Sequence, residues 1–409
     1  MIVAHVGPPP RRIGGPAGYL NQLQSAASTD AHPRHDVRFP GPAAAPPRAT
    51  KARTIGLLTR VRRKLFGPKF YRPSEDDLAR TGGVIDRMMR EIGDDVRAEA
   101  APSRASALAA ADVVFTHDSF SAEMALRERR SGQQVWMMCH GVTPMALYAA
   151  WSWAVPEADW RTLLEYTDVR SWVDWELDVW RRVDRFILPC PEAAESFRTI
   201  DARFADVLDR ARFVLSGASA PHSPSSGADL TGPRNLTGRL GLYLGSPEPY
   251  RGFDALVAAA QALPADSNVV IAVAGPDPKK VPSHPAFRPL GRVADVARLL
   301  QSVDFLINVN RFSLFDLSTI EATESGTPLL LHAVGGNRAF ERLGAGCLML
   351  SDLAPATIAG GLQRMAALEP AALDELGRRS RACWEQQLTP RHMWEHHLAF
   401  YDDTGPSVA

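Results

Sequence analysis

The residues best suited to chemistry lie in one stretch of the second half of the chain. Glu321 stands in an apolar run of helical character, shortly before the turn Gly326-Thr327-Pro328. A carboxylate only accepts hydrogen bonds, so it can hold both hydroxyls of a cis-diol at once. Phe315, Asp316 and Leu317 lie where the helix would begin, and the backbone N–H groups of a helix start suit a diphosphate. The stretch favours a site for a ligand that carries both a cis-diol and a diphosphate, with Glu321 on the diol.

A solvated glutamate on a surface helix is the alternative interpretation of Glu321 taken alone. The whole run favours a site, because an apolar strand at 329–331 and a loop containing Gly335 and Gly336 follow in order. Ser318 and Thr319 suit helix capping or the phosphate side of such a site.

Alternating strands and helices must position this stretch. We expect strands at 240–244, 268–274 and 305–309, helices at 253–263 and 293–301, and a short connection at 290–292. This alternation predicts an α/β fold with a parallel sheet covered on both faces. The strands end at the following residues, on the sheet edge where parallel sheets bind ligands: Gly245 and Ser246, Gly275, and Asn308 to Asn310.

The first half of the chain shows the same pattern. A strand at 2–6, a loop with Gly14 and Gly15, and a helix from about Tyr19 form the anion-facing turn of α/β proteins. Strands at 112–116 and 135–139 end at His117 and His140, so both histidines are expected at the ligand-binding edge. A structural role is the alternative for each histidine.

The motif region resembles the donor-binding signature of family 4 glycosyltransferases, which have the GT-B fold. The likeness runs from about Gly241 to Ala345 and continues more loosely through the first half. It implies two Rossmann-like, doubly wound parallel-sheet domains that face a central cleft. The acceptor-binding domain would span 1–217, a Ser-, Pro- and Gly-rich linker 218–238, and the donor-binding domain 239–389. A helix at 390–409 would pack back onto the first domain.

The resemblance also implies the reaction. A sugar would pass from a nucleotide-diphosphate sugar to a hydroxyl of a natural product, polysaccharide or lipid, with retention and with no metal or other cofactor. Glu321 would bind the ribose, while Arg251 and the amides near Asp316 and Leu317 would bind the diphosphate. His140 would contact the transferred sugar or the nearby diphosphate.

The glycines take roles from the same resemblance. Gly14 and Gly15 would lie beneath the donor diphosphate and near the acceptor. Gly335 and Gly336 would allow close backbone approach on the donor side.

Two positions depart from the family pattern. Ser246 stands where the family has the first cation of its diphosphate clamp, so Arg292 or Arg311 would substitute, or diphosphate affinity would be weaker. Ser313 stands where the family has the first of two paired glutamates. Asn308, Asn310 and Arg311 are the polar groups placed to fill that gap.

Composition narrows the partners. Lys plus Arg equals Asp plus Glu at 46 each, so no overall field favours nucleic acid. The four cysteines are widely spaced without a metal-binding pattern and fit a reduced, cytoplasmic protein. No apolar run reaches the length of a membrane span, and the first residues lack the pattern of a signal peptide.

A basic, amphipathic segment at 51–72 is the candidate for peripheral membrane contact at the inner face. A solvated helix or a loop over the acceptor cleft is the alternative. Six of the nine tryptophans lie between 151 and 180 and predict core packing, with Trp151 or Trp153 as candidates to line an acceptor pocket. The oligomeric state is not predicted.

Two rival functions stay open at this point. One is a GT-B-fold protein that binds sugar nucleotides but has lost transfer, which Ser246 and Ser313 favour. The other is another sugar-nucleotide enzyme on the same fold, such as an epimerase.

Overall fold

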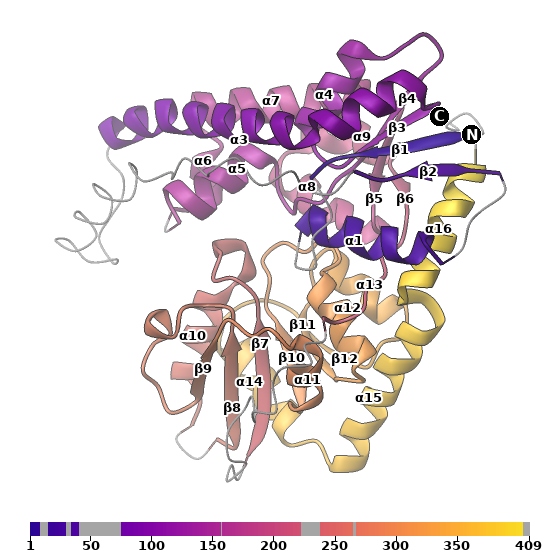
Figure 1. Cartoon of the computed structure of the whole chain (residues 1–409). Coiled ribbons are helices and arrows are strands. Elements are labelled where there is room, and N and C mark those ends of the chain that lie inside the picture. Colours follow the sequence, from indigo (N-terminus) through magenta and orange to yellow (C-terminus); the bar gives the residue numbers. More distant parts are fainter. Residues whose placement is uncertain are drawn as a thin grey trace. The chain divides into compact units, whose positions relative to one another are not determined.

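The computed structural model describes residues 1–8, 15–29, 34–40, 75–156, 158–221, 238–264 and 267–403. Two six-stranded parallel sheets organise these residues (Figure 1). Gly14, the basic segment 51–72 and most of the expected linker lie outside the described residues.

The first sheet has the strand order β2-β1-β3-β4-β5-β6. Its strands are β1 Ile2–Val6, β2 Asp36–Arg38, β3 Val113–Thr116, β4 Gln134–Met138, β5 Arg185–Leu188 and β6 Arg212–Phe213. The main helices of this half are α1 Gly15–Ala27, α3 Glu75–Ala110, α4 Ser119–Glu128, α5 Met145–Ala149, α6 Trp160–Leu163, α7 Thr167–Arg182, α8 Ala194–Ile200 and α9 Ala205–Asp209. The long α3 packs beside α4, α7 and β1 (Figure 1).

The second sheet has the order β12-β11-β10-β7-β8-β9. Its strands are β7 Arg239–Leu244, β8 Val269–Ala274, β9 Phe287–Gly291, β10 Phe305–Asn308, β11 Leu329–His332 and β12 Cys347–Leu350. The helices are α10 Phe253–Gln261, α11 Val296–Gln301, α12 Leu317–Glu324, α13 Gly336–Arg342, α14 Pro355–Ala366, α15 Pro370–Cys383 and α16 Pro390–Asp402. β10 pairs with β7 and β11, so the motif region follows a central strand.

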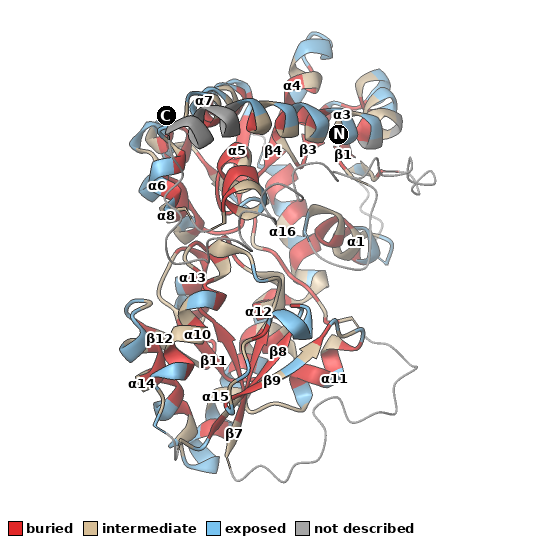
Figure 2. Ribbon diagram, turned by 90° about the vertical axis from the view of Figure 1, so that its left-hand side faces the viewer, coloured by how far each residue is buried: buried red, intermediate tan, exposed pale blue. Residues whose placement is uncertain are grey.

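Burial on both faces explains the apolar sequences of the second sheet. Phe305, Ile271 and Leu330 are fully buried, and Ile358 and Leu362 of α14 belong to the same core. The strands of this sheet are largely coloured as buried in Figure 2. A parallel sheet reads as a continuous apolar run because helices cover both of its faces. The core therefore fixes the strands, and their carboxyl ends carry the loops of interest.

Helix starts follow from their capping residues. The Asp295 carboxylate accepts from the N–H of Arg298 at 3.1 Å, so α11 begins at Val296 rather than at 293 as expected from the sequence. Residues 290–292, expected as a connection, instead include the end of β9 at Gly291. Thr389 caps α16 in the same way through the N–H of His392, with Pro390 in the first turn.

The described chain forms two compact units. One takes in the described residues of Met1–Pro10, Arg34–Phe186 and Ile200–Asp209, and the other those of Arg11–Pro33, Ile187–Thr199 and Arg210–Ala409. α1 and α16 both belong to the second unit and pack against each other. The helices in the described ranges include none that is long and apolar enough to cross a membrane.

Candidate functional site

The loops after β7 and β8 meet through two glycines. A β-carbon on Gly275 would lie 2.2 Å from the carbonyl oxygen of Gly245, and Gly275 has a φ of 116°. Any side chain there would be both strained and overlapping with backbone. Gly245 and Gly275 therefore let two strand ends approach each other at the edge where ligands of parallel sheets bind.

Arg251 lies against this turn. It ends the short 3-10 turn Pro249–Arg251, and Gly252, with a φ of 67°, then starts α10. A β-carbon on Gly245 would lie 3.2 Å from Nη1 of Arg251, and Nε of Arg251 donates to the Tyr250 hydroxyl at 3.1 Å. The guanidinium is thus held at the carboxyl end of β7.

Arg251 keeps its positive charge in this environment. Burial opposes it, but the nearby Tyr250 and Asp316 raise the pKa of Arg251 above its usual value. The side chain is partly buried, so its cation acts in a medium of lower dielectric than water. A fixed, partly desolvated cation of this kind suits a diphosphate.

Arg311, expected as one possible substitute for the cation missing at Ser246, is bonded to neighbouring residues. Its guanidinium forms two bonds to the Asp254 carboxylate, at 2.8 and 2.7 Å, and a third to the Pro249 carbonyl at 2.5 Å. Its charge is already matched, and its effect is to brace the turn that carries Arg251. Arg292 follows the end of β9 and is exposed.

The start of α12 is built around Asp316. One oxygen of its carboxylate accepts from Asn310 at 2.8 Å, from Ser313 at 3.1 Å and from Asn308 at 3.2 Å. Asp316 is the N-cap residue of α12, yet its side chain does not cap the helix. The carboxylate of Asp316 bonds to side chains of the preceding loop instead of to the backbone N–H groups of α12.

The helix start consequently keeps open donors. Thr319 and Ile320 donate their N–H groups to the Asp316 carbonyl. No acceptor is found among the described residues for the backbone N–H groups of Leu317 and Ser318. Two unfilled donors at the positive end of a helix are an arrangement that binds anions.

The loop before α13 packs tightly on the same network. A β-carbon on Gly335 would lie 2.3 Å from the Ser313 carbonyl oxygen, and one on Gly336 would lie 2.2 Å from that of Leu314. Gly336 also donates its N–H to Ser313 at 2.9 Å. A side chain at either position would overlap backbone atoms, so packing within the chain already requires glycine at 335 and 336.

Ser313 is fully buried at the centre of this packing. Its hydroxyl lies 2.9 Å from Oδ1 of Asn337 and 3.1 Å from Asp316. Phe315 has a φ of 154°, which is unusual for a side-chain-bearing residue, and its ring stacks on Phe340 at 4.4 Å. The Ser313 side chain therefore takes part in the internal hydrogen bonding of this loop.

Glu321 lies on α12, one turn beyond the open donors. Its carboxylate is half-buried and has no hydrogen-bond or ion-pair partner within the described ranges. Burial, with a smaller effect of Glu324, raises the pKa of Glu321 to about 8. The neighbouring Glu324 differs, because its carboxylate accepts from the Ala220 N–H at 2.5 Å. A desolvated carboxylate without a partner is a group prepared for a ligand.

His117 and His140 lie at adjacent strand ends in the first unit, after β3 and β4. Nδ1 of His117 is 2.8 Å from Nε2 of His140. Burial lowers the pKa of His140 to about 3, so its ring is neutral at physiological pH. Gly15 begins α1 with a φ of 59°.

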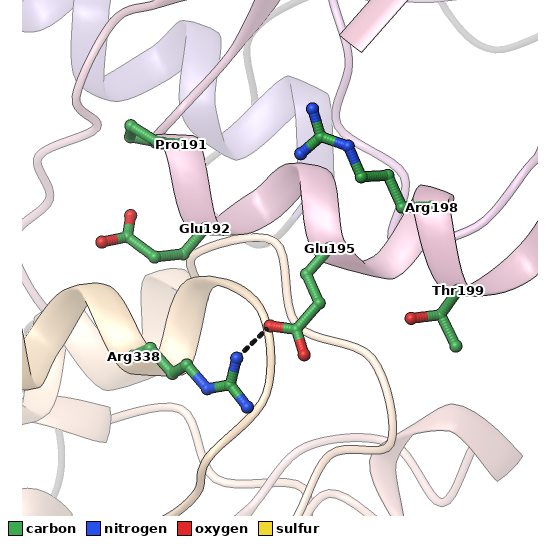
Figure 3. Close-up of a pocket in the computed structure, with 6 residues that line it drawn as sticks. All are labelled: Pro191, Glu192, Glu195, Arg198, Thr199 and Arg338. Atoms are coloured by element: carbon green, nitrogen blue, oxygen red, sulfur yellow. Dashed lines mark hydrogen bonds and ion pairs between the residues drawn. The ribbon is translucent and has the colours of Figure 1, made fainter. Parts of the chain in front are cut away.

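Sequence reasoning missed Glu195, which lies on α8. Its carboxylate accepts from the Gly335 N–H at 2.9 Å and from Arg338 at 2.9 Å. Figure 3 shows this ion pair in an open pocket of about 550 Å³, lined also by Pro191, Glu192, Arg198 and Thr199. No signal in the sequence indicates a contact between residues so far apart along the chain.

Apart from Gly14, which lies outside the described residues, and Gly15 at the start of α1, the sequence-predicted residues form three groups. Gly245, Gly275 and Arg251 meet at the end of β7. Ser246 directly follows Gly245, and its carbonyl oxygen accepts a hydrogen bond from the Tyr243 hydroxyl at 2.9 Å. The second group surrounds the start of α12 and contains Asn310, Phe315, Asp316, Leu317, Gly335 and Gly336, with Glu321 on the helix itself. His140 belongs to the other unit. Within the described ranges, no three His, Cys, Asp or Glu side chains group so as to hold a metal ion.

Comparison with known proteins agrees with this architecture. Residues 238–367 match the family model described as glycosyl transferases group 1, over less than half of the chain. No curated protein matches the chain in sequence.

Solved structures resemble the whole chain. Sucrose-phosphate synthase from Thermosynechococcus elongatus is 16% identical, with a TM-score of 0.60 over 98% of each chain. Anabaena HepE in complex with UDP and glucose is 12% identical, with a TM-score of 0.56 over 98% of this chain and 99% of HepE. WaaG, a glycosyltransferase involved in lipopolysaccharide biosynthesis, is 12% identical, with a TM-score of 0.55 over 99% and 100%. The chain has the GT-B fold of these glycosyltransferases.

Proposed function

We propose that this protein is a retaining, metal-independent glycosyltransferase that moves a sugar from a nucleotide-diphosphate sugar to a hydroxyl acceptor. The observation that carries the proposal is the half-buried Glu321 carboxylate, which lacks a protein partner within the described ranges and stands one turn beyond two open helix donors. The match of residues 238–367 to group 1 glycosyl transferases supports it.

Glu321 is the ribose-binding residue in this proposal. Both hydroxyls of a ribose can donate to one carboxylate, which offers acceptors only. The hydrogen bonds would replace solvation that Glu321 has lost through burial, so binding relieves an existing cost. A hydrogen bond to a charged group contributes about 1.5–3 kcal/mol.

The diphosphate is bound by Arg251 and by the N–H groups of Leu317 and Ser318. As the bond between the anomeric carbon and the diphosphate breaks, negative charge grows on the leaving oxygens. Fixed donors and a fixed cation stabilise that charge without reorganising. Ser246 contributes no second cation and Asp316 lies close enough to act on Arg251, so ground-state affinity for the diphosphate is modest.

His140 contacts the transferred sugar or the nearby diphosphate. Its neutral ring carries one donor nitrogen and one acceptor nitrogen, and Nε2 faces His117. A natural product, a polysaccharide or a lipid supplies the acceptor hydroxyl, and the basic segment 51–72 is the candidate contact with a membrane if that acceptor is a lipid. The proposed location is the cytoplasm.

UDP-sugars are the first donors to test, because the HepE structures hold UDP, glucose or UDP-glucose. Transfer is measured as acceptor-dependent release of the nucleoside diphosphate from a donor panel. We expect release that falls at least about tenfold in Arg251→Ala. Unchanged turnover and donor affinity in that variant would refute the diphosphate role.

A sugar-nucleotide-binding protein without transfer activity is the second candidate, and the serine at position 313 favours it. The buried Ser313 hydroxyl supports a loop and presents no carboxylate to the donor sugar. This candidate predicts nucleotide binding without donor consumption across acceptors. Donor consumption with no acceptor present would instead indicate hydrolysis or epimerisation.

A further inference from the structure

Three histidines from three adjacent strands form one hydrogen-bonded row in the first unit. His5 lies in β1, His117 follows β3 and His140 follows β4. Nδ1 of His5 is 2.9 Å from Nε2 of His117, and Nδ1 of His117 is 2.8 Å from Nε2 of His140. The strand order β1-β3-β4 brings the three residues side by side.

The rings meet edge to edge. Neighbouring ring centroids are 5.2 and 5.1 Å apart, and the ring planes are within 21° and 24° of parallel. These separations match the nitrogen–nitrogen distances plus the half-widths of two imidazole rings. Each contact is therefore an in-line hydrogen bond with room for one proton.

The surroundings keep both ends of the row neutral. His5 and His117 are almost completely buried, and Phe39 and Phe115 lie against the His5 ring at 5.0 and 4.7 Å. Burial lowers the pKa of His5 and of His140 to about 3, and for His5 the nearby His140 adds to the effect. A proton on either end of the row would be a buried charge.

Neutral imidazoles in such a row have coupled tautomers. A neutral imidazole has one N–H and one acceptor nitrogen. If His5 donates from Nδ1, His117 accepts at Nε2, must donate from Nδ1, and leaves His140 with its proton on Nδ1. If His140 donates from Nε2, every proton lies on Nε2. Mixed patterns place two donors or two acceptors in contact.

We infer that His5 is a positioning residue whose tautomer is coupled, through His117, to the tautomer of His140. A change at His5, two strands away in the sheet, therefore alters which nitrogen of His140 carries the proton. The part concerning sugar transfer rests on the proposed function, whereas the coupling itself does not. The substrate group that meets His140 must have the complementary hydrogen-bonding character.

Nitrogen NMR of the full chain with isotopically labelled histidine tests the coupling directly. We expect His117 and His140 to be neutral and to carry their protons on nitrogens of the same name. Opposite tautomers at the two positions, or a doubly protonated His117, would overturn the inference. Neither outcome depends on enzymatic activity.

Two variants at position 5 add a functional readout. His5→Phe keeps a planar ring but cannot bond to His117, so His140 should show a mixture of tautomers. His5→Asn offers an amide near the position of Nδ1 that can donate or accept, so it should bring the tautomer of His140 back toward that of the wild type. A single unchanged tautomer in His5→Phe would contradict the role of His5.

In a transfer assay, His5→Phe should lower kcat by about tenfold or more, since part of the protein then holds His140 in the tautomer that does not match the substrate group. His5→Asn should recover most of that loss. His397→Phe is the control for losing a buried, hydrogen-bonded histidine elsewhere, in the row Tyr19–His397–Tyr401. An equal loss of kcat in His397→Phe and His5→Phe would show general destabilisation and overturn the positioning role. If no donor is consumed by the wild type, the proposed function fails while the NMR result still decides the inference.

Discussion

Asn310 donates from Nδ2 to one carboxylate oxygen of Asp316 at 2.8 Å, where the loop after β10 meets the start of α12. This bond, with those from Asn308 and Ser313, turns the Asp316 side chain away from its own helix. Two backbone donors are thereby left for an anion. The same bonds place a negative carboxylate close enough to Arg251 to raise its pKa.

Removing the charge of Asp316 should strengthen diphosphate binding. In Asp316→Asn the amide oxygen still accepts from its neighbours, while the repulsion between carboxylate and diphosphate disappears. We expect affinity for a nucleoside diphosphate to rise by about three- to tenfold at low salt, and less at high salt. Calorimetric titration of the variant at two salt concentrations measures the change.

The matched control is Asp254→Asn. Asp254 pairs with Arg311 and is largely exposed, so its charge is screened. A gain as large in Asp254→Asn as in Asp316→Asn would mean that overall charge, rather than the helix start, controls affinity.

Glu321→Gln should weaken ribonucleotide binding by about ten- to a hundredfold, the worth of a hydrogen bond to a charged acceptor. A 2′-deoxynucleotide should bind the wild type more weakly and should lose less on the substitution. The coupling of the two changes, measured by a double cycle of dissociation constants, isolates the contact. Additive losses would place the ribose elsewhere.

Affinity for the nucleotide should increase with pH up to about 8 and then level off, because diol hydroxyls donate to the ionised form of Glu321. Below that pH, binding releases a proton from Glu321. Calorimetry in buffers of different ionisation enthalpy measures the release. Glu321→Gln should abolish the proton release that comes from Glu321. Glu324→Gln should shift that release to lower pH, because it removes the neighbouring negative charge.

The same raised pKa has a consequence for the unliganded protein. Because the folded state holds the Glu321 proton more tightly than the unfolded chain does, the contribution of Glu321 to stability is present at low pH and is lost as pH rises from the ordinary value of 4.5 to about 8. Glu321→Gln should therefore melt above the wild type at about pH 9, although it binds nucleotide more weakly. A lower melting temperature for the variant at that pH would argue for a structural partner of Glu321.

Gly275→Ala should destabilise the fold at the site. Its β-carbon would overlap the Gly245 carbonyl, and φ is positive at this position, so we expect a loss of about 2 kcal/mol or more. Gly360→Ala is the matched control, since that helical position on α14 has open space around it and alanine should add up to about 1 kcal/mol. Thermal unfolding compares the two, and equal effects would contradict the close approach of the β7 and β8 loops.

The sequence supported prediction of the sheet and of the strand ends, because apolar runs bounded by Gly and polar residues are local signals. Glu321 was placed on a helix after such a strand, and it lies on α12. Contacts between distant residues could not be predicted in this way. Nothing local indicates that Glu195 meets Gly335, or that His5 in the middle of a strand joins His117.

The glycine pair before α13 shows a further limit of sequence reasoning. Gly335 and Gly336 were expected to serve the donor, yet their spacing from Ser313 and Leu314 already requires glycine. Close packing against the chain itself and close approach to a ligand both require glycine, so the sequence looks the same in either case. The structure adds the missing information, because it shows which atoms lie close to each glycine.

The central claim is a sugar-nucleotide site built on Glu321, and thermal unfolding with UDP-, GDP-, dTDP- and ADP-sugars tests it most directly. A donor present at about a hundred times its dissociation constant should add about 2.7 kcal/mol to the free energy of unfolding. We expect one nucleotide to raise the melting temperature of the wild type clearly and that of Glu321→Gln much less. No shift with any nucleotide, or an equal shift in both proteins, would contradict the account.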